Sequence, residues 1–207
     1  MEDVVFRKGF LSEREQRRVV ELVRGITPGF YVPKTRWGKS MSLRMNCLGR
    51  HWSARDYKYH PTRADVDQLP CAPIPPELQE LARRALLETK YVPPDQLKPY
   101  EMCIVNWYDE AAGKLGDHQD NSESAESIAA GYPIVSLSVG ASCVFRIGGL
   151  ELRGPYEQHT LESGDLVVFG RSKRLAFHGV KKILAGTTPN DLGFEEPGRI
   201  NMTFRLC

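Results

Sequence analysis

The sequence has no apolar run long enough to cross a membrane, and its start, Met1-Glu2-Asp3, lacks the basic and long apolar regions of a signal peptide. Its five cysteines are an odd number, lie far apart and include no C-x-x-C pair, which argues against a disulfide framework or a cysteine zinc site. Internal repeats are also missing. We therefore expect a monomer with reduced thiols in the cytoplasm, or in the nucleus of a eukaryote, without a membrane partner.

A chain of 207 residues is long enough to bury a core and is most simply one domain, residues 1–207. Two amphipathic helices are predicted in its first half. The first opens at Ser12 with an S-x-x-E capping box and stops at Gly25. The second opens at Pro75, repeats apolar residues at helical spacing and ends before Pro93.

After residue 100 the pattern changes to short apolar or alternating segments separated by turn signals, as in β-strands. Because no helical pattern lies between these segments, they predict a double-sheet barrel or jelly roll over about residues 100–207. The expected fold class is α+β and mainly β, with both helices outside the β-core. Strands are expected at 102–105, 134–139, 166–169, 176–180 and 199–205.

His118 and Asp120 are one residue apart, so in a β-strand their side chains would lie on the same face. His178, expected on another strand, could supply a third ligand. Two histidines and a carboxylate form the facial triad that holds Fe(II) and leaves its other positions open. The H-x-D pair alone is weak evidence, because two exposed polar residues after a turn would look the same.

The last expected strand carries two arginines on one face. Apolar side chains fill the other face of residues 199–206, opposite Arg199, Asn201 and Arg205. A guanidinium matches a carboxylate in geometry and charge, so this face could hold a dicarboxylate beside the metal. The pattern leaves open which arginine meets which carboxylate, and a solvated strand face would read the same.

In this order the motifs resemble the AlkB family of Fe(II)/2-oxoglutarate dioxygenases, close to the bacterial alkylation-repair members. The similarity covers nearly the whole chain and includes the segments 106–108, 118–120, 133–136, 145–150, 164–165, 178–179 and 199–205. The resemblance implies a double-stranded β-helix core and an enzyme that uses Fe(II), O₂ and 2-oxoglutarate. It assigns the metal and its catalysis to His118, Asp120 and His178, and 2-oxoglutarate to Asn106, Tyr108, Arg199, Asn201 and Arg205.

Residues 34–63 contain eight basic residues and one acidic residue, a formal charge of +7 that leaves −5 for the rest of the chain. Four aromatic residues are interleaved with these charges: Trp37, Trp52, Tyr57 and Tyr59. Cations attract phosphates and rings stack on bases, which favours a nucleic-acid partner over a solvated basic face. In the AlkB family this region, here about 30–65, is a nucleotide-recognition lid, and the resemblance places Trp52 where a relative's aromatic residue stacks on the damaged base. We expect His118 to lie near the other face of that base.

The chain departs from the family pattern after Asp120. That loop is longer than in the bacterial relative, and Ser122 occupies a position where the relative places an acidic residue next to the base amine. Base preference is therefore left open, and the residues expected to bind the base are Trp52, Tyr57, Tyr59, Ser122 and Glu123. A second longer loop is expected at 187–191. His159 matches no ligand position and is expected near a turn.

The implied activity is oxidative demethylation of bases of the 1-methyladenine and 3-methylcytosine type in single- or double-stranded DNA, releasing succinate, CO₂ and formaldehyde, as in alkylation repair. An RNA or tRNA demethylase is the first alternative, because no contact to a 2′-hydroxyl can be read from the sequence. A silent nucleic-acid binder is disfavoured, since it needs no iron triad. A dioxygenase acting on proteins or small molecules is disfavoured by the +7 segment.

Overall fold

The structure is a computed structural model, and it describes residues 2–207. The helical segments are α1 (Glu13–Arg24), α2 (Pro76–Glu88) and α3 (Ala125–Ala129), with two 3₁₀ turns, η1 (Pro94–Gln96) and η2 (Arg171–Lys173). The strands are β1 (Val4–Arg7), β2 (Arg44–Leu48), β3 (His51–Ser53), β4 (Lys58–His60), β5 (Met102–Asp109), β6 (Leu115–His118), β7 (Ile134–Gly140), β8 (Cys143–Gly148), β9 (Tyr156–Leu161), β10 (Leu166–Phe169), β11 (His178–Ile183) and β12 (Gly198–Arg205).

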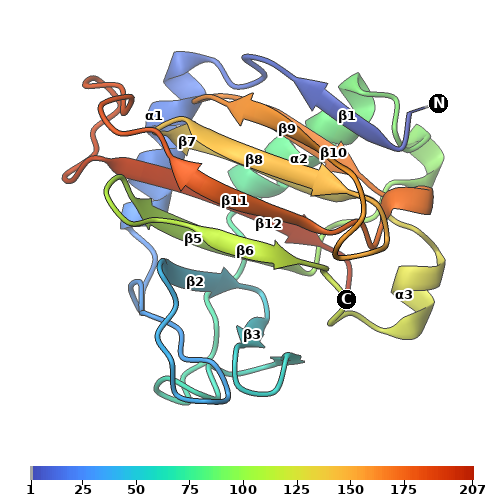
Figure 1. Cartoon of the computed structure of the whole chain (residues 1–207), viewed down its shortest axis with the longest axis horizontal. Coiled ribbons are helices and arrows are strands. Elements are labelled where there is room, and N and C mark those ends of the chain that lie inside the picture. Colours follow the sequence, from blue (N-terminus) through green and yellow to red (C-terminus); the bar gives the residue numbers. More distant parts are fainter. Residues whose placement is uncertain (1) are drawn as a thin grey trace.

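Two antiparallel sheets form the body of the molecule (Figure 1). The larger sheet has the strand order β1-β10-β7-β12-β5-β2, and the smaller has the order β6-β11-β8-β9. The short hairpin of β3 and β4 belongs to neither, and in Figure 1 β3 lies below β2, the edge strand of the larger sheet. This double-sheet arrangement with outer helices confirms the predicted jelly roll.

The two predicted helices are confirmed and cover the outer face of the larger sheet. Ser12 and Glu15 form the expected capping box: the Ser12 amide donates to the Glu15 carboxylate at 2.8 Å, and the Glu15 amide donates to Ser12 Oγ. Gly25 ends α1, and Pro76 is the first helical residue of α2. Among residues 2–207, no helix combines the length and apolar character needed to span a bilayer.

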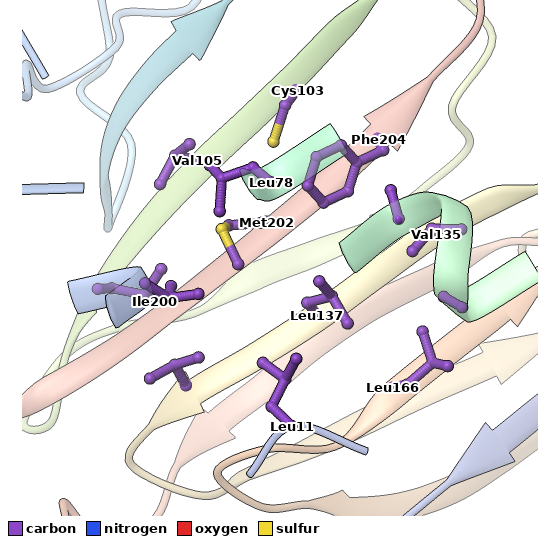
Figure 2. Close-up of a cluster of buried hydrophobic side chains, with 14 of the residues drawn as sticks. Leu11, Leu78, Cys103, Val105, Val135, Leu137, Leu166, Ile200, Met202 and Phe204 are labelled. Atoms are coloured by element: carbon purple, nitrogen blue, oxygen red, sulfur yellow. The ribbon is translucent and has the colours of Figure 1, made fainter. Parts of the chain in front are cut away.

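Alternation along β5, β7 and β12 creates the two faces on which the site depends. On each strand one set of side chains points to the helices and forms an apolar cluster; Figure 2 shows Val105, Leu137 and Met202 in it. The intervening side chains point into the space between the sheets. There the second sheet covers them, so the polar face of β12 is buried: Arg199 is only 1% exposed.

Several local predictions need correction. The strand expected to carry both His118 and Asp120 ends at His118, and Asp120 lies in the following loop. The strand expected from residue 176 begins at His178, and the short helix α3 interrupts the all-β half. His159 lies in the middle of β9, not near a turn, and stacks on Phe6 with the ring centroids 3.9 Å apart.

A glycine fixes the turn between β2 and β3. Gly49 has φ +77°, and a Cβ there would collide with the carbonyl oxygen of Glu101. We expect Gly49→Ala to lower the free energy of unfolding by about 2–4 kcal/mol, measured by urea denaturation. Gly9→Ala is the control, because Gly9 also has a positive φ, +59°, but open space around it, and should cost only about 1–2 kcal/mol. Equal losses would contradict the collision at Gly49.

Candidate metal centre and substrate cavity

Three side chains that could ligate a metal meet at the end of the smaller sheet. His118 closes β6, His178 opens β11, and the antiparallel pairing sets these residues opposite each other. Asp120 follows in the loop, with its Oδ1 3.6 Å from His118 Nε2 and its Oδ2 3.6 Å from His178 Nε2. One donor atom from each residue lies within 4.8 Å of the others. The structure thus brings the predicted triad together, although only the histidines belong to strands.

Hydrogen bonds orient both imidazoles for metal binding. Nδ1 of His118 lies 2.9 Å from the Gly116 carbonyl oxygen, and Nδ1 of His178 lies 2.9 Å from that of Ala176. A carbonyl only accepts, so each Nδ1 carries the proton and each Nε2 keeps its lone pair. Both Nε2 atoms face Asp120. The backbone therefore selects the tautomer that a divalent metal requires.

The charges of the site keep its ligands in the forms that bind a metal. Burial, aided by His118, lowers the pKa of His178 to about 4, so this imidazole is neutral at pH 7. Burial alone would raise the pKa of Asp120, but the positive charge of Arg205 and the nearby histidines outweigh it and hold that pKa below its usual range. Asp120 is therefore a carboxylate at any pH near neutrality.

Arg205 belongs to a buried ionic network behind the triad. Its guanidinium contacts Asp120 Oδ2 at 2.6 and 3.0 Å, and it lies 3.5 Å from Glu123. Glu123, whose side chain is fully buried, also pairs with Arg174 at 3.0 Å and accepts a hydrogen bond from the Tyr59 hydroxyl at 3.2 Å. Glu123 thus lies behind the cavity wall and ties the loop after Asp120 to the lid through Tyr59.

The predicted dicarboxylate face lines an inner cavity beside the triad. Asn106, Tyr108, Arg199, Asn201 and Arg205 are all in its wall. Arg199 donates to Ser138 Oγ at 2.6 Å and weakly to the Ala141 carbonyl, but its buried Nε has no partner. Among residues 2–207 no carboxylate forms an ion pair with Arg199. A buried cation without a counter-ion is costly, so this guanidinium fits an anionic ligand.

An outer cavity of about 370 Å³ opens on the other side of the triad. Its wall contains His118 and Asp120 together with the predicted base-binding residues Trp52, Tyr57 and Tyr59. Ser122 also lines it, and the Trp52 Nε1 donates to Ser122 Oγ at 2.9 Å. Since His118, Asn106 and Arg205 line both cavities, the triad lies where the inner and outer cavities meet.

Two parts of this site were not predicted from the sequence. Arg174 directly follows η2 in a short basic stretch with Arg171 and Lys173, and no periodic pattern distinguishes it from these neighbours. The apolar wall formed by Met41, Leu43 and Met45 was read only as part of a basic segment. Of the eight basic residues between 34 and 63, six are exposed; Arg44 packs on Trp107, and Arg63 is buried.

The chain is similar in sequence and structure to known oxygenases. The model of the 2OG-Fe(II) oxygenase superfamily matches residues 3–205. The alpha-ketoglutarate-dependent dioxygenase AlkB homolog of Caulobacter vibrioides is 36% identical over 202 residues, which are 95% of this chain and 84% of that protein. The DNA N(6)-methyladenine demethylase ALKBH1C of Arabidopsis thaliana is 36% identical over 98% of this chain, which spans about half (48%) of that protein's length. The structure of OsALKBH1 aligns with a TM-score of 0.87 at 34% identity, over 100% of this chain and 98% of that one.

Proposed function

Because the chain belongs to the AlkB family within the 2OG-Fe(II) oxygenase superfamily, we propose that it removes N-methyl groups oxidatively from bases of nucleic acid. One observation supports this proposal: two members of the His-Asp-His triad, His118 and Asp120, lie in the wall of a cavity that aromatic residues of a basic segment also line. The proposed substrates are DNA bases of the 1-methyladenine and 3-methylcytosine type, and the proposed role is repair of alkylation damage.

Family membership confirms the predicted cofactors Fe(II), 2-oxoglutarate and O₂. The residues present fit them: two imidazoles with free Nε2 atoms and one carboxylate for the metal, and a buried, unpaired guanidinium for the dicarboxylate. When bound, these groups supply the oxidation of the N-methyl carbon, with succinate, CO₂ and formaldehyde as products. We assign His118, Asp120 and His178 to the metal. Asn106, Tyr108 and Asn201 are assigned to 2-oxoglutarate as hydrogen-bonding residues.

The two arginines have different surroundings, which supports different partners for them. Arg205 already contacts the metal-binding carboxylate of Asp120, so we assign it to the 2-oxoglutarate carboxylate nearer the metal. Arg199 lies deeper, beside Ser138, and we assign it to the remote carboxylate. Such paired charge-assisted bonds would fix both the position and the direction of the dicarboxylate.

The outer cavity would receive the base after it leaves the stack, because a base inside a duplex cannot reach an enclosed metal. Trp52 offers a flat ring in the wall of that cavity, and its hydrogen bond to Ser122 holds the ring in place. Tyr57 and Tyr59 would narrow the opening and exclude water. Glu123 lies outside the cavity wall, so we propose that it positions Arg205 and Tyr59 and does not itself touch the base.

A second substrate is favoured by Ser122. The bases 1-methyladenine and 3-methylcytosine are cations at neutral pH, whereas N6-methyladenine is neutral. Ser122 brings an uncharged hydroxyl to the cavity, and the next carboxylate, Glu123, is neutralised by Arg174. A neutral base suits this wall, so N6-methyladenine in DNA is the alternative substrate, as the name of the Arabidopsis relative states for that protein.

The test compares formaldehyde release from 1-methyladenine, 3-methylcytosine and N6-methyladenine, each placed in single-stranded DNA, duplex DNA and RNA. Fe(II), 2-oxoglutarate and O₂ are supplied in every reaction. We expect release from at least one DNA substrate, and none when 2-oxoglutarate is omitted. A preference for RNA would select the alternative RNA demethylase, and no release from any substrate would defeat the proposed function.

Trp52 provides a sharper test of the base cavity. We expect Trp52→Ala to weaken binding of the methylated strand about tenfold, because a stacked base contributes roughly 1–3 kcal/mol. Decarboxylation of 2-oxoglutarate without substrate should persist, since Trp52 does not line the inner cavity. Succinate and formaldehyde are measured separately. Demethylation kinetics equal to those of the wild type would contradict the stacking role.

A further inference from the structure

The segment from residue 31 to residue 45 forms a hairpin on the edge strand β2. Its outer part, residues 33–41, is here named the tip hairpin. Its turn is closed by a hydrogen bond of 2.8 Å from the Gly38 amide to the Thr35 carbonyl, and Gly38 has φ +76°. Arg36 and Trp37 are therefore the two central residues of the turn and stand at its outer end.

Trp37 is exposed to an unusual degree. Its exposed fraction is 73%, the highest of any large apolar residue among residues 2–207. The guanidinium carbon of Arg36 lies 4.2 Å from the centre of the Trp37 ring, and Lys34 and Lys39 are exposed on the two arms. No acidic residue occurs in the tip hairpin. An exposed indole surrounded by cations has the chemistry that binds a base flanked by phosphates.

The tip hairpin is also part of the outer cavity. Thr35 and Met41, on its two arms, line the cavity together with Trp52 and Tyr57. Thr35 Oγ1 is enclosed and has no hydrogen-bond partner. Trp37 is two residues from Thr35, and two residues of even fully extended chain span at most about 7 Å. Trp37 therefore lies close to the rim of the outer cavity, where a nucleic-acid strand must pass when one of its bases enters.

We propose that Trp37 stacks on the base next to the flipped nucleotide, while Arg36, Lys34 and Lys39 bind the phosphates on either side of it. The substrate is then a polynucleotide strand, and a free nucleotide lacks the part that the tip hairpin binds. This inference rests on the proposed function, because it takes the outer cavity as the place of the methylated base. It adds a second aromatic contact outside that cavity.

The first experiment compares two substrates that carry the same methylated base, a five-nucleotide single strand and the 5′-mononucleotide. We expect Trp37→Ala to raise KM for the pentanucleotide about tenfold and to leave kcat and the mononucleotide KM unchanged. Trp37→Phe keeps a ring and should restore most of the loss. Leu69→Ala is the matched control, since Leu69 is 51% exposed in the same half of the chain but lines neither cavity. An unchanged pentanucleotide KM, or an equal rise for both substrates, would overturn the proposal.

The second experiment measures binding without turnover. Titration with an unmethylated single-stranded oligonucleotide should quench tryptophan fluorescence in the wild type and much less in Trp37→Phe. Arg36→Ala and Lys39→Ala should each reduce the slope of log Kd against log salt by about 0.7, whereas Lys182→Ala on β11 should not. If the wild type demethylates nothing, the proposed function fails, and this titration still decides the stacking. Equal quenching in the wild type and Trp37→Phe would refute it.

Discussion

His118→Ala is expected to abolish formaldehyde and succinate release, to below 1% of the wild-type rate. The substitution removes one of the three proposed metal ligands, and a site reduced to two protein ligands would hold Fe(II) weakly and in the wrong geometry. His118 is the proposed ligand best suited to replacement, because its side chain is 34% exposed and its Nδ1 donates to a backbone carbonyl, that of Gly116. The fold should therefore survive, and thermal unfolding should change little.

Asp120→Ala should have the same effect on turnover for two reasons at once. It removes a ligand and also leaves Arg205 buried without its nearest counter-ion, which costs about 3–5 kcal/mol of stability. Asp120→Asn also removes the charge, but it keeps the shape and an oxygen that can accept a hydrogen bond from Arg205. Turnover should be lost in both variants, with the larger loss of stability in Asp120→Ala.

His159→Ala is the matched control for the triad. His159 is a histidine of the same β-core, but it stacks on Phe6 and pairs with Glu157 away from the metal centre. The turnover of the His159→Ala variant and its Fe(II) affinity, measured by titration under anaerobic conditions, should equal those of the wild type. Normal 2-oxoglutarate-dependent formaldehyde release by His118→Ala or Asp120→Ala would overturn the assignment of the triad.

The sequence predicts the periodic parts of this molecule well, because periodicity is a local property. The capping box at Ser12, the helix after Pro75 and the alternation along residues 199–205 are each visible within a dozen residues. Whether the polar face of residues 199–205 meets solvent or the protein interior was not predictable in this way. An alternating strand looks the same whether its polar face meets solvent or a second sheet, and here the smaller sheet buries it.

Side chains fixed by distant partners were the least predictable. Glu123 follows Asp120 by three residues and was expected to touch the base, yet its place is set by Arg174, fifty-one positions further along the chain. Arg174 is one of three basic residues between 171 and 174, and nothing in that stretch reveals which of them pairs with Glu123. Likewise, the i, i+2 rule for strands predicted that Asp120 lies beside His118. The two residues do lie together, but Asp120 belongs to the loop after β6 and not to the strand.

Arg199→Ala is expected to raise KM for 2-oxoglutarate on the order of 100-fold, with a smaller effect on kcat. Hydrogen bonds to a charged group contribute about 1.5–3 kcal/mol each, and a guanidinium makes two of them with one carboxylate. The protein leaves the buried Nε of Arg199 without a partner, so a ligand carboxylate can take it without displacing an ion pair. For the same reason the alanine variant breaks no ion pair, and its stability should fall less than that of Asp120→Ala.

The measurement is succinate formation against 2-oxoglutarate concentration, together with direct binding of 2-oxoglutarate in the presence of Mn(II), which does not depend on turnover. Arg199→Lys keeps the charge but loses the planar fork, so it should recover only part of the affinity. Ser138→Ala removes the hydroxyl that receives a 2.6 Å hydrogen bond from Arg199 and should weaken 2-oxoglutarate only a few-fold. Arg146→Ala is the control, because Arg146 pairs with Asp117 and lines neither cavity. If Arg199→Ala binds 2-oxoglutarate as tightly as Arg146→Ala does, the inner cavity is not the dicarboxylate site, and the buried guanidinium must serve another anion.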